Sequence, residues 1–156
     1  MRQSAGILLY RFREGVPEFF LVHPGGPFWE GREAGAWSIP KGEFADPESP
    51  LEAAVREFTE ETGTRPEGPL LPLPPVTQKA GKKVWAWAAE GDLDAGAIRS
   101  NHFRMQWPPR SGKWILVPEV DKAGWFRWAE AATLINPAQV ALLEALAAQL
   151  SFKPGP

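Results

Sequence analysis

The 156-residue chain contains no cysteine and only two histidines. Without cysteine it can form no disulfide, carries no thiolate nucleophile and cannot bind zinc through sulfur. His23 and His102 leave little for a histidine-rich metal site or a histidine-dependent triad, and we expect both to be ordinary polar residues. The chemistry of any site must therefore come from other side chains.

The chain also lacks a large excess of charge of either sign, and it lacks long apolar runs. It has 17 lysines and arginines against 19 aspartates and glutamates, for a formal net charge of −2. Proteins that grip a nucleic-acid backbone normally need a basic surface, so we expect no nucleic-acid partner. No segment is apolar for long enough to span a bilayer, and the run Ala5–Tyr10 is too short for the core of a signal peptide. We therefore expect a cytoplasmic protein without a membrane partner.

The order of the predicted elements indicates one α/β domain over residues 1–156, a length that suits one domain better than two. A helix is predicted over 50–62, because Ser49 and Glu52 form a capping box and Gly63 suits a left-handed stop. A second helix is predicted from Asn136 onward, with one buried stripe of leucines (Leu142, Leu143, Leu146 and Leu150). We expect strands over 3–12, 17–23, 82–90 and parts of 103–107 and 123–128, short extended segments at 37–40 and within 107–118, and loops or irregular chain over 24–36, 41–48 and 65–75. Strands interleaved with two helices favour a sandwich with a mixed sheet.

The predicted helix at 50–62 carries three glutamates in one narrow arc. At about 100° per residue, Glu57, Glu60 and Glu61 all lie at the border of the apolar face. Like charges at these spacings destabilise a helix by roughly 0.2–0.5 kcal/mol per pair, and Arg56 relieves part of this by pairing with Glu60. The remainder needs a cation, and clustered carboxylate oxygens suit Mg²⁺ or Mn²⁺. Taken alone, the cluster is equally consistent with a solvated acidic face.

The segment 42–64 resembles the Nudix box, the signature of the Nudix hydrolase family. That signature is Gly, five residues, Glu, seven residues, Arg-Glu, an apolar residue, any residue, Glu-Glu, any residue, Gly and an apolar residue. Every fixed position matches at the right spacing: Gly42, Glu48, Arg56, Glu57, Glu60, Glu61 and Gly63. Phe58 is aromatic where an aliphatic residue is usual and Thr64 is polar where an apolar one is usual, and both departures concern packing. The resemblance implies a single Nudix hydrolase domain over 1–156, folded as a Nudix-type α/β/α sandwich with a mixed sheet.

The resemblance also implies a metal-dependent pyrophosphohydrolase that cleaves a nucleoside diphosphate linkage by water attack on phosphorus. Glu57, Glu60 and Glu61 are the implied catalytic and metal-binding residues, and the implied metal is Mg²⁺ or Mn²⁺. Glu57 and Glu61 would be ligands, whereas Glu60 would be a ligand or the general base. The substrate is expected to be a small nucleotide, and the oligomeric state stays open.

Residues next to this trio are assigned supporting roles by the same resemblance. The backbone carbonyl of Lys41 would be a further metal ligand. Arg56 and Glu48 would pair and hold the loop against the helix. Gly42 would permit the tight start of the loop, which an ordinary turn glycine would also do.

Two segments outside the acidic trio are similar to the diadenosine polyphosphate hydrolase branch, namely Pro40-Lys41-Gly42 and Ala5-Gly6-Ile7-Leu8. This similarity favours a dinucleoside polyphosphate as substrate, followed by nucleoside triphosphates and nucleotide sugars. The Lys41 side chain would touch a phosphate or be solvated. Arg110 and Lys113, in a proline-rich loop, are candidates for binding further phosphates.

Other residues and other functions are weaker candidates. We expect Glu119 to be a structural acid at a strand start rather than a fourth site carboxylate. Most of the eight tryptophans are expected in the core, and Trp29 and Trp37 are the best candidates to meet a nucleobase. The alternative function is a catalytically silent Nudix-fold nucleotide sensor, which should have lost box carboxylates that this chain retains. An RNA-end processing protein would need a basic surface to bind RNA, and the charge count does not provide one.

Overall fold

The computed structural model describes residues 2–152, which form a mixed β-sheet with helices on both faces. The strands run in the order β4, β5, β1, β2, β8, and β3 pairs with β1 beside this path. β1 and β5 are parallel and the other pairs are antiparallel, so the sheet is mixed as predicted. The bounds are β1 Gln3–Arg13, β2 Val16–Pro24, β3 Lys41–Phe44, β4 Leu71–Thr77, β5 Lys83–Glu90 and β8 Val120–Phe126.

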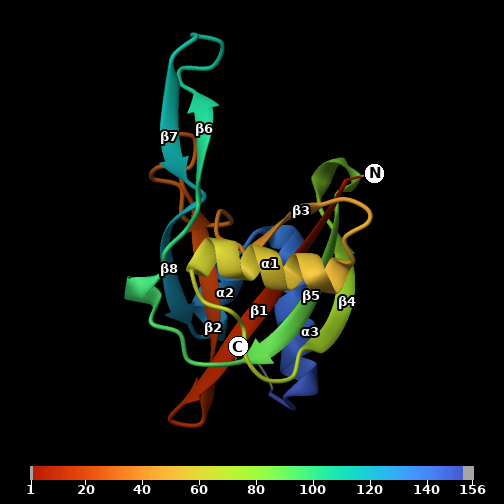
Figure 1. Cartoon of the computed structure of the whole chain (residues 1–156). Coiled ribbons are helices and arrows are strands. Elements are labelled where there is room, and N and C mark those ends of the chain that lie inside the picture. Colours follow the sequence, from red (N-terminus) through yellow and green to blue (C-terminus); the bar gives the residue numbers. More distant parts are fainter. Residues whose placement is uncertain (1, 153–156) are drawn as a thin grey trace.

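Side-chain alternation along β1 divides the core into two layers. Ile7 and Leu9 face helix α1 (Pro50–Thr62), whose Phe58 is buried against this side of the sheet. Leu8 and Tyr10 face α2 (Trp128–Leu134) and α3 (Val140–Gln149) on the other side. Figure 1 shows α1 in front of the sheet and α2 and α3 behind it. The predicted α/β/α sandwich is confirmed, and no helix within residues 2–152 is long and apolar enough to cross a membrane.

Helix α1 begins and ends where its capping residues predict. The Ser49 side chain accepts a hydrogen bond from the Glu52 backbone N–H at 3.2 Å, and the Glu52 carboxylate accepts one from the Ser49 N–H at 3.0 Å. Gly63 has a left-handed φ of 81°, and its N–H donates to the carbonyl of Thr59 at 2.8 Å. Local chemistry therefore sets the helix that carries the box glutamates.

Two segments predicted as loop are strands. Residues 71–77 form β4, an edge strand whose register shifts between Leu73 and Val76, where two prolines stand. An edge strand with such an irregularity tolerates proline because few of its N–H groups need a partner. The start of the 41–48 segment forms β3, which pairs with the first residues of β1. Both strands depend on long-range pairing that the local sequence does not show.

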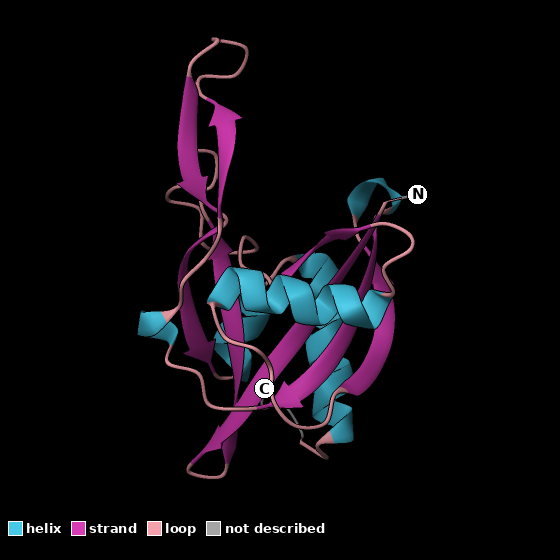
Figure 2. Cartoon of the chain, in the orientation of Figure 1, coloured by secondary structure: helices cyan, strands magenta, loops and turns pink. Residues whose placement is uncertain are grey.

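The remaining helices and strands lie in the second half of the chain. Helix α2 follows β8 directly, so residues 2–152 contain three α-helices where the sequence predicted two. The second predicted helix begins as a 3-10 turn at Pro137–Gln139 and continues as α3, whose Leu142, Leu143 and Leu146 are fully buried, with Leu150 partly so. β6 (His102–Gln106) and β7 (Trp114–Pro118) form a separate hairpin that projects from the body (Figures 1 and 2). Short 3-10 turns also occur at Lys79–Gly81 and Ala95–Ala97.

Candidate functional site

Helix α1 directs two glutamates toward the interior. Glu57 and Glu61 are one helical turn apart and therefore lie on the same side of the helix. Phe58, only 1% exposed, fixes the rotation of the helix against the sheet. As a result, Glu57 and Glu61 are 7% and 8% exposed, which is unusual for carboxylates.

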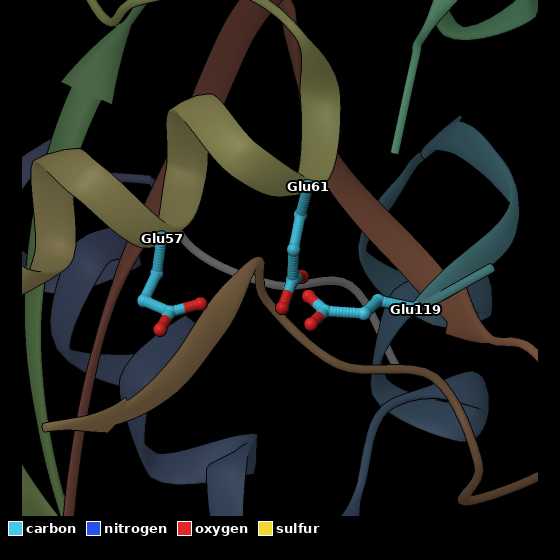
Figure 3. Close-up of side chains that lie close together, drawn as sticks. All are labelled: Glu57, Glu61 and Glu119. Carbon is cyan, nitrogen blue, oxygen red and sulfur yellow. The ribbon is translucent and has the colours of Figure 1, made fainter. Parts of the chain in front are cut away.

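A third carboxylate reaches the same place from a distant part of the chain. Glu119 stands between β7 and β8, and its carboxylate lies within 4.8 Å of those of Glu57 and Glu61. Figure 3 shows the side chains of Glu61 and Glu119 pointing toward each other, with Glu57 nearby on the helix. The Glu119 backbone N–H donates to the carbonyl of Asn101 at 2.8 Å, which fixes its position. This corrects our expectation of a structural acid, since Glu119 belongs to the carboxylate cluster.

Burial and mutual repulsion disfavour the charged form of all three carboxylates. Burial raises the pKa of Glu61 well above its ordinary value, and the neighbouring Glu57 and Glu119 raise it further. Burial likewise raises the pKa of Glu57 and of Glu119. Arg56 and Lys41 oppose these shifts only in part. Buried, clustered, hard oxygen donors with incomplete charge compensation fit a divalent cation such as Mg²⁺ or Mn²⁺.

Gly42 leaves the space that the Glu57 carboxylate occupies. A Cβ atom built on Gly42 would lie 2.1 Å from both Cδ and Oε2 of Glu57. The backbone of β3 therefore passes directly beside this carboxylate, and any side chain at position 42 would displace it. The φ of Gly42 is one that other residues also adopt, so backbone conformation does not require a glycine here. The close approach of the Glu57 carboxylate does require one.

Arg56 ties the loop before α1 to the acidic face of the helix. Its Nε and Nη2 donate to the two carboxylate oxygens of Glu48 at 2.8 and 2.9 Å, so the predicted pair is present. Its Nη1 donates to Glu57 at 2.9 Å and to Glu60 at 3.1 Å. Glu48 first, and then Glu57, raise the pKa of the Arg56 guanidinium further above its ordinary value.

Glu60 differs from the other two box glutamates in its position. It is bound by Arg56, and its carboxylate is not one of the three that converge. It is still close enough to Glu119 to raise the pKa of that carboxyl through like-charge repulsion. The structure thus brings together Glu57, Glu61 and Glu119, with Glu60 beside them rather than among them. No local pattern in the sequence identifies Glu119 as the third member.

The carboxylate cluster opens into a cleft of about 390 Å³ that is also lined by two lysine side chains. Lys41 and Lys82 line it together with Glu57, Glu61 and Glu119. Burial, followed by repulsion from Lys82, lowers the pKa of Lys41. The charge and the backbone of Lys41 act in the opposite direction on the pKa of Glu61 and lower it, which favours the ionised form of this carboxylate. The predicted metal contact through the Lys41 carbonyl stays a prediction.

The two tryptophans proposed to meet a base lie in different environments. Trp29 lines the cleft. Trp37 is 5% exposed and packs edge-on against Phe126 in the core, so the expectation for Trp37 is wrong. Phe103, at the base of the projecting hairpin, lines the cleft instead.

The basic residues of the hairpin turn do not line this cleft, and one histidine is more deeply buried than expected. Arg110 and Lys113 are exposed in the β6–β7 turn and are not among the cleft-lining residues, so their role in phosphate binding stays a prediction. His23 is 1% exposed, with Nδ1 2.9 Å from Asp121 Oδ1 and Nε2 2.5 Å from the carbonyl of Arg32. It is therefore a buried bridge between β8 and the 24–36 loop rather than an ordinary polar residue.

Comparison with known proteins adds a domain match and several structures of the same fold. The NUDIX domain model matches residues 1–146. A C. elegans Ap4A hydrolase in a binary complex is 23% identical, with 97% of this chain and 98% of that chain covered and a TM-score of 0.66. The NUDIX domain of Shewanella oneidensis NrtR complexed with ADP ribose is 17% identical, with 95% and 87% covered and a TM-score of 0.64. A structure from work on MutT of Aliivibrio salmonicida and Vibrio cholerae is 18% identical, with 95% and 97% covered and a TM-score of 0.57. At these identities the structural similarity shows a shared fold.

Proposed function

The chain belongs to the NUDIX family of hydrolases, and we propose that it is a metal-dependent pyrophosphohydrolase that cleaves a nucleoside diphosphate linkage by water attack on phosphorus. The observation that carries this proposal is the convergence of three carboxylates within 4.8 Å beside two lysines in one cleft. Such a site offers negative charge for cations and positive charge for phosphates. Both are needed when an anionic substrate must be held against carboxylates.

We assign the metal to Glu57, Glu61 and Glu119 and favour Mg²⁺, with Mn²⁺ as an alternative. When bound, a divalent ion neutralises phosphate charge and lowers the pKa of the attacking water. The chain's own part is to hold the three carboxylates in place. Gly42 gives Glu57 its space and Arg56 orients Glu57 through the 2.9 Å hydrogen bond.

Glu60 and Lys41 are assigned roles in the transfer itself. Glu60 lies beside the trio, and its ion pair with Arg56 is partly exposed to solvent. It is the proposed general base, which accepts the proton of the attacking water. As the water oxygen bonds to phosphorus, the bond to the leaving phosphate oxygen breaks. Lys41 and Lys82 would compensate the charge on the phosphates, since both line the cleft.

We propose a dinucleoside polyphosphate as the first substrate to test, with nucleoside triphosphates second. The Pro40-Lys41-Gly42 entry supports this order, and the fold shared with the Ap4A hydrolase is compatible with it. A nucleotide sensor is the second candidate, because the NUDIX domain of NrtR is a structural neighbour that was solved with ADP ribose. The intact set of box carboxylates favours the enzyme over the sensor.

The test is a hydrolysis assay with Mg²⁺ and with Mn²⁺ on diadenosine polyphosphates, nucleoside triphosphates, ADP-ribose and nucleotide sugars. We expect turnover of one class that EDTA removes, with ¹⁸O from water in one phosphate product. Glu61→Gln should abolish turnover, whereas Glu144→Gln, an exposed helical glutamate on α3 across the sheet, should not change it. Full activity of Glu61→Gln would refute the metal assignment. A folded protein that binds a nucleotide and turns over none of the panel would favour the sensor.

A further inference from the structure

Gln139 is a fully buried polar side chain at the start of α3, the helix on the face of the sheet opposite to α1 (Figure 1). Its Oε1 accepts a hydrogen bond from the Ile39 backbone N–H at 3.0 Å. Its Nε2 donates to Ser38 Oγ and to Gln78 Oε1, each at 3.0 Å. The carbonyl oxygen and both amide protons are therefore used, as the burial of an amide requires.

The segment that this amide holds leads directly into the carboxylate cleft. Ser38 and Ile39 line a cavity of about 130 Å³, and this cavity shares Lys41, Glu61 and Glu119 with the cleft. Two residues after Ile39, the backbone and the charge of Lys41 lower the pKa of Glu61. The position of the segment therefore affects a carboxylate that is assigned to the metal.

Backbone hydrogen bonds hold this segment on both sides of Ile39. The N–H and the carbonyl of Ser38 are bonded to Val22 on β2, at 2.9 and 2.8 Å. The carbonyl of Pro40 accepts a hydrogen bond from the Ile7 N–H on β1 at 3.1 Å. Between these two anchors, the buried N–H of Ile39 is bonded to the amide side chain. Loss of that acceptor would leave the N–H unpaired, so the segment would have to shift or admit water.

The amide thus connects the start of α3 with the strand β3, which passes beside the site glutamates. We propose that Gln139 is a positioning residue for the carboxylate cleft and acts through Ile39 on the backbone of Lys41 and Gly42. A shift of this backbone would alter the space beside the Glu57 carboxylate, because a Cβ on Gly42 would lie only 2.1 Å from it. Gln139 itself does not line the cleft. This inference rests on the proposed function, because it assumes that the carboxylates bind a divalent ion.

The test measures Mn²⁺ affinity by calorimetry, without substrate, at a temperature well below the Tm of every variant. Gln139→Met fills the same space with a side chain that offers the Ile39 N–H no oxygen acceptor. We expect Mn²⁺ binding to weaken about 10-fold, the lower end of the usual range when a group that orients metal ligands is lost. Gln139→Glu keeps an acceptor for this N–H and should restore most of the affinity.

Two further variants on α3 are the controls. Gln149→Met removes an exposed amide whose Nε2 donates to the carbonyl of Pro72 at 3.3 Å, and it should leave the Mn²⁺ affinity unchanged. Leu143→Ala removes fully buried side-chain atoms on the same helix and should lower Tm without changing the Mn²⁺ affinity. This second control separates a positioning role from a general loss of stability.

Each outcome bears on the positioning role, and the proposed function is tested separately. Wild-type Mn²⁺ affinity in Gln139→Met would overturn the positioning role and leave the proposed function intact. An equal loss of affinity in Leu143→Ala would also overturn it, because lower stability would then explain the effect. A wild-type protein that binds no Mn²⁺ would refute the metal assignment and the positioning role with it. Weaker Mn²⁺ binding by Gln139→Met, in a protein that hydrolyses no nucleotide, would keep the positioning role and refute the proposed enzyme.

Discussion

Gly42→Ala adds a single methyl group at the point where β3 passes beside the Glu57 carboxylate. The new Cβ would lie 2.1 Å from Glu57 Cδ and Oε2, whereas real Cβ contacts are essentially never under 3.0 Å. The carboxylate must therefore move by roughly 1 Å or more. A displacement of this size at a reacting centre costs on the order of 10²-fold in rate, so we expect kcat to fall by about that factor.

The fold should change much less than the activity. The φ of Gly42 is outside the left-handed region, so alanine can adopt the same backbone. The atoms in conflict are the end of a flexible side chain rather than backbone. We expect a stability loss below about 1 kcal/mol, which corresponds to roughly 2–4 °C in Tm for a domain of this size.

The assay pairs kcat with Mn²⁺ affinity and Tm for the wild type and two glycine variants. Gly96→Ala is the control, since a Cβ there makes only an ordinary contact of 3.5 Å and strains no backbone. It should leave all three quantities unchanged. Wild-type kcat and Mn²⁺ affinity in Gly42→Ala would refute the role of Glu57. A Tm loss beyond about 10 °C would show that the methyl group disturbs the backbone rather than the carboxylate.

The remaining predictions concern the electrostatics of the site and its packing. Burial raises the pKa of Glu61 in the folded protein above its ordinary 4.5, so the folded state holds this proton more tightly than the unfolded chain. The stability of the metal-free protein should therefore fall as the pH rises above about 4.5 and level off once Glu61 is ionised in both states. Glu61→Gln should remove part of this decline in Tm measured against pH in EDTA, and identical profiles would contradict the sign of the shift. Phe58→Ala should lose about 3–5 kcal/mol in urea unfolding, because Phe58 is 1% exposed in the layer that positions the site glutamates. A loss under about 1 kcal/mol would show that α1 is held by other contacts.

Helix α1 could be predicted from the sequence because local interactions determine where it begins and ends. The capping pair Ser49 and Glu52 and the stop at Gly63 act within a few residues of one another, so their effect does not depend on the rest of the fold. The helical period likewise places Glu57 and Glu61 one turn apart in any helix that includes them. The mixed sandwich followed from the order of strands and helices, and the family followed from the spacing of the box.

Tertiary structure decided which side chains meet at the site. Glu119 joins Glu57 and Glu61 because β8 pairs with β2 and because Gly25 and Asn101 form hydrogen bonds with the backbone of Glu119. These contacts join residues that are far apart in the chain, and no local pattern encodes them.

The same reason explains the other differences between expectation and structure. Trp37 is buried in the core and Phe103 lines the cleft, because the burial of a ring depends on what packs against it, and its sequence neighbours do not specify this. The proline-containing strand β4 exists because β5 offers it an edge to pair with. By itself, the sequence determined the helix that carries the acidic residues and the chemistry of that helix. The packing of distant segments decided that Glu119 joins the cluster, which residues line the cleft and that β4 forms the edge of the sheet. Such contacts form only when the whole chain is folded.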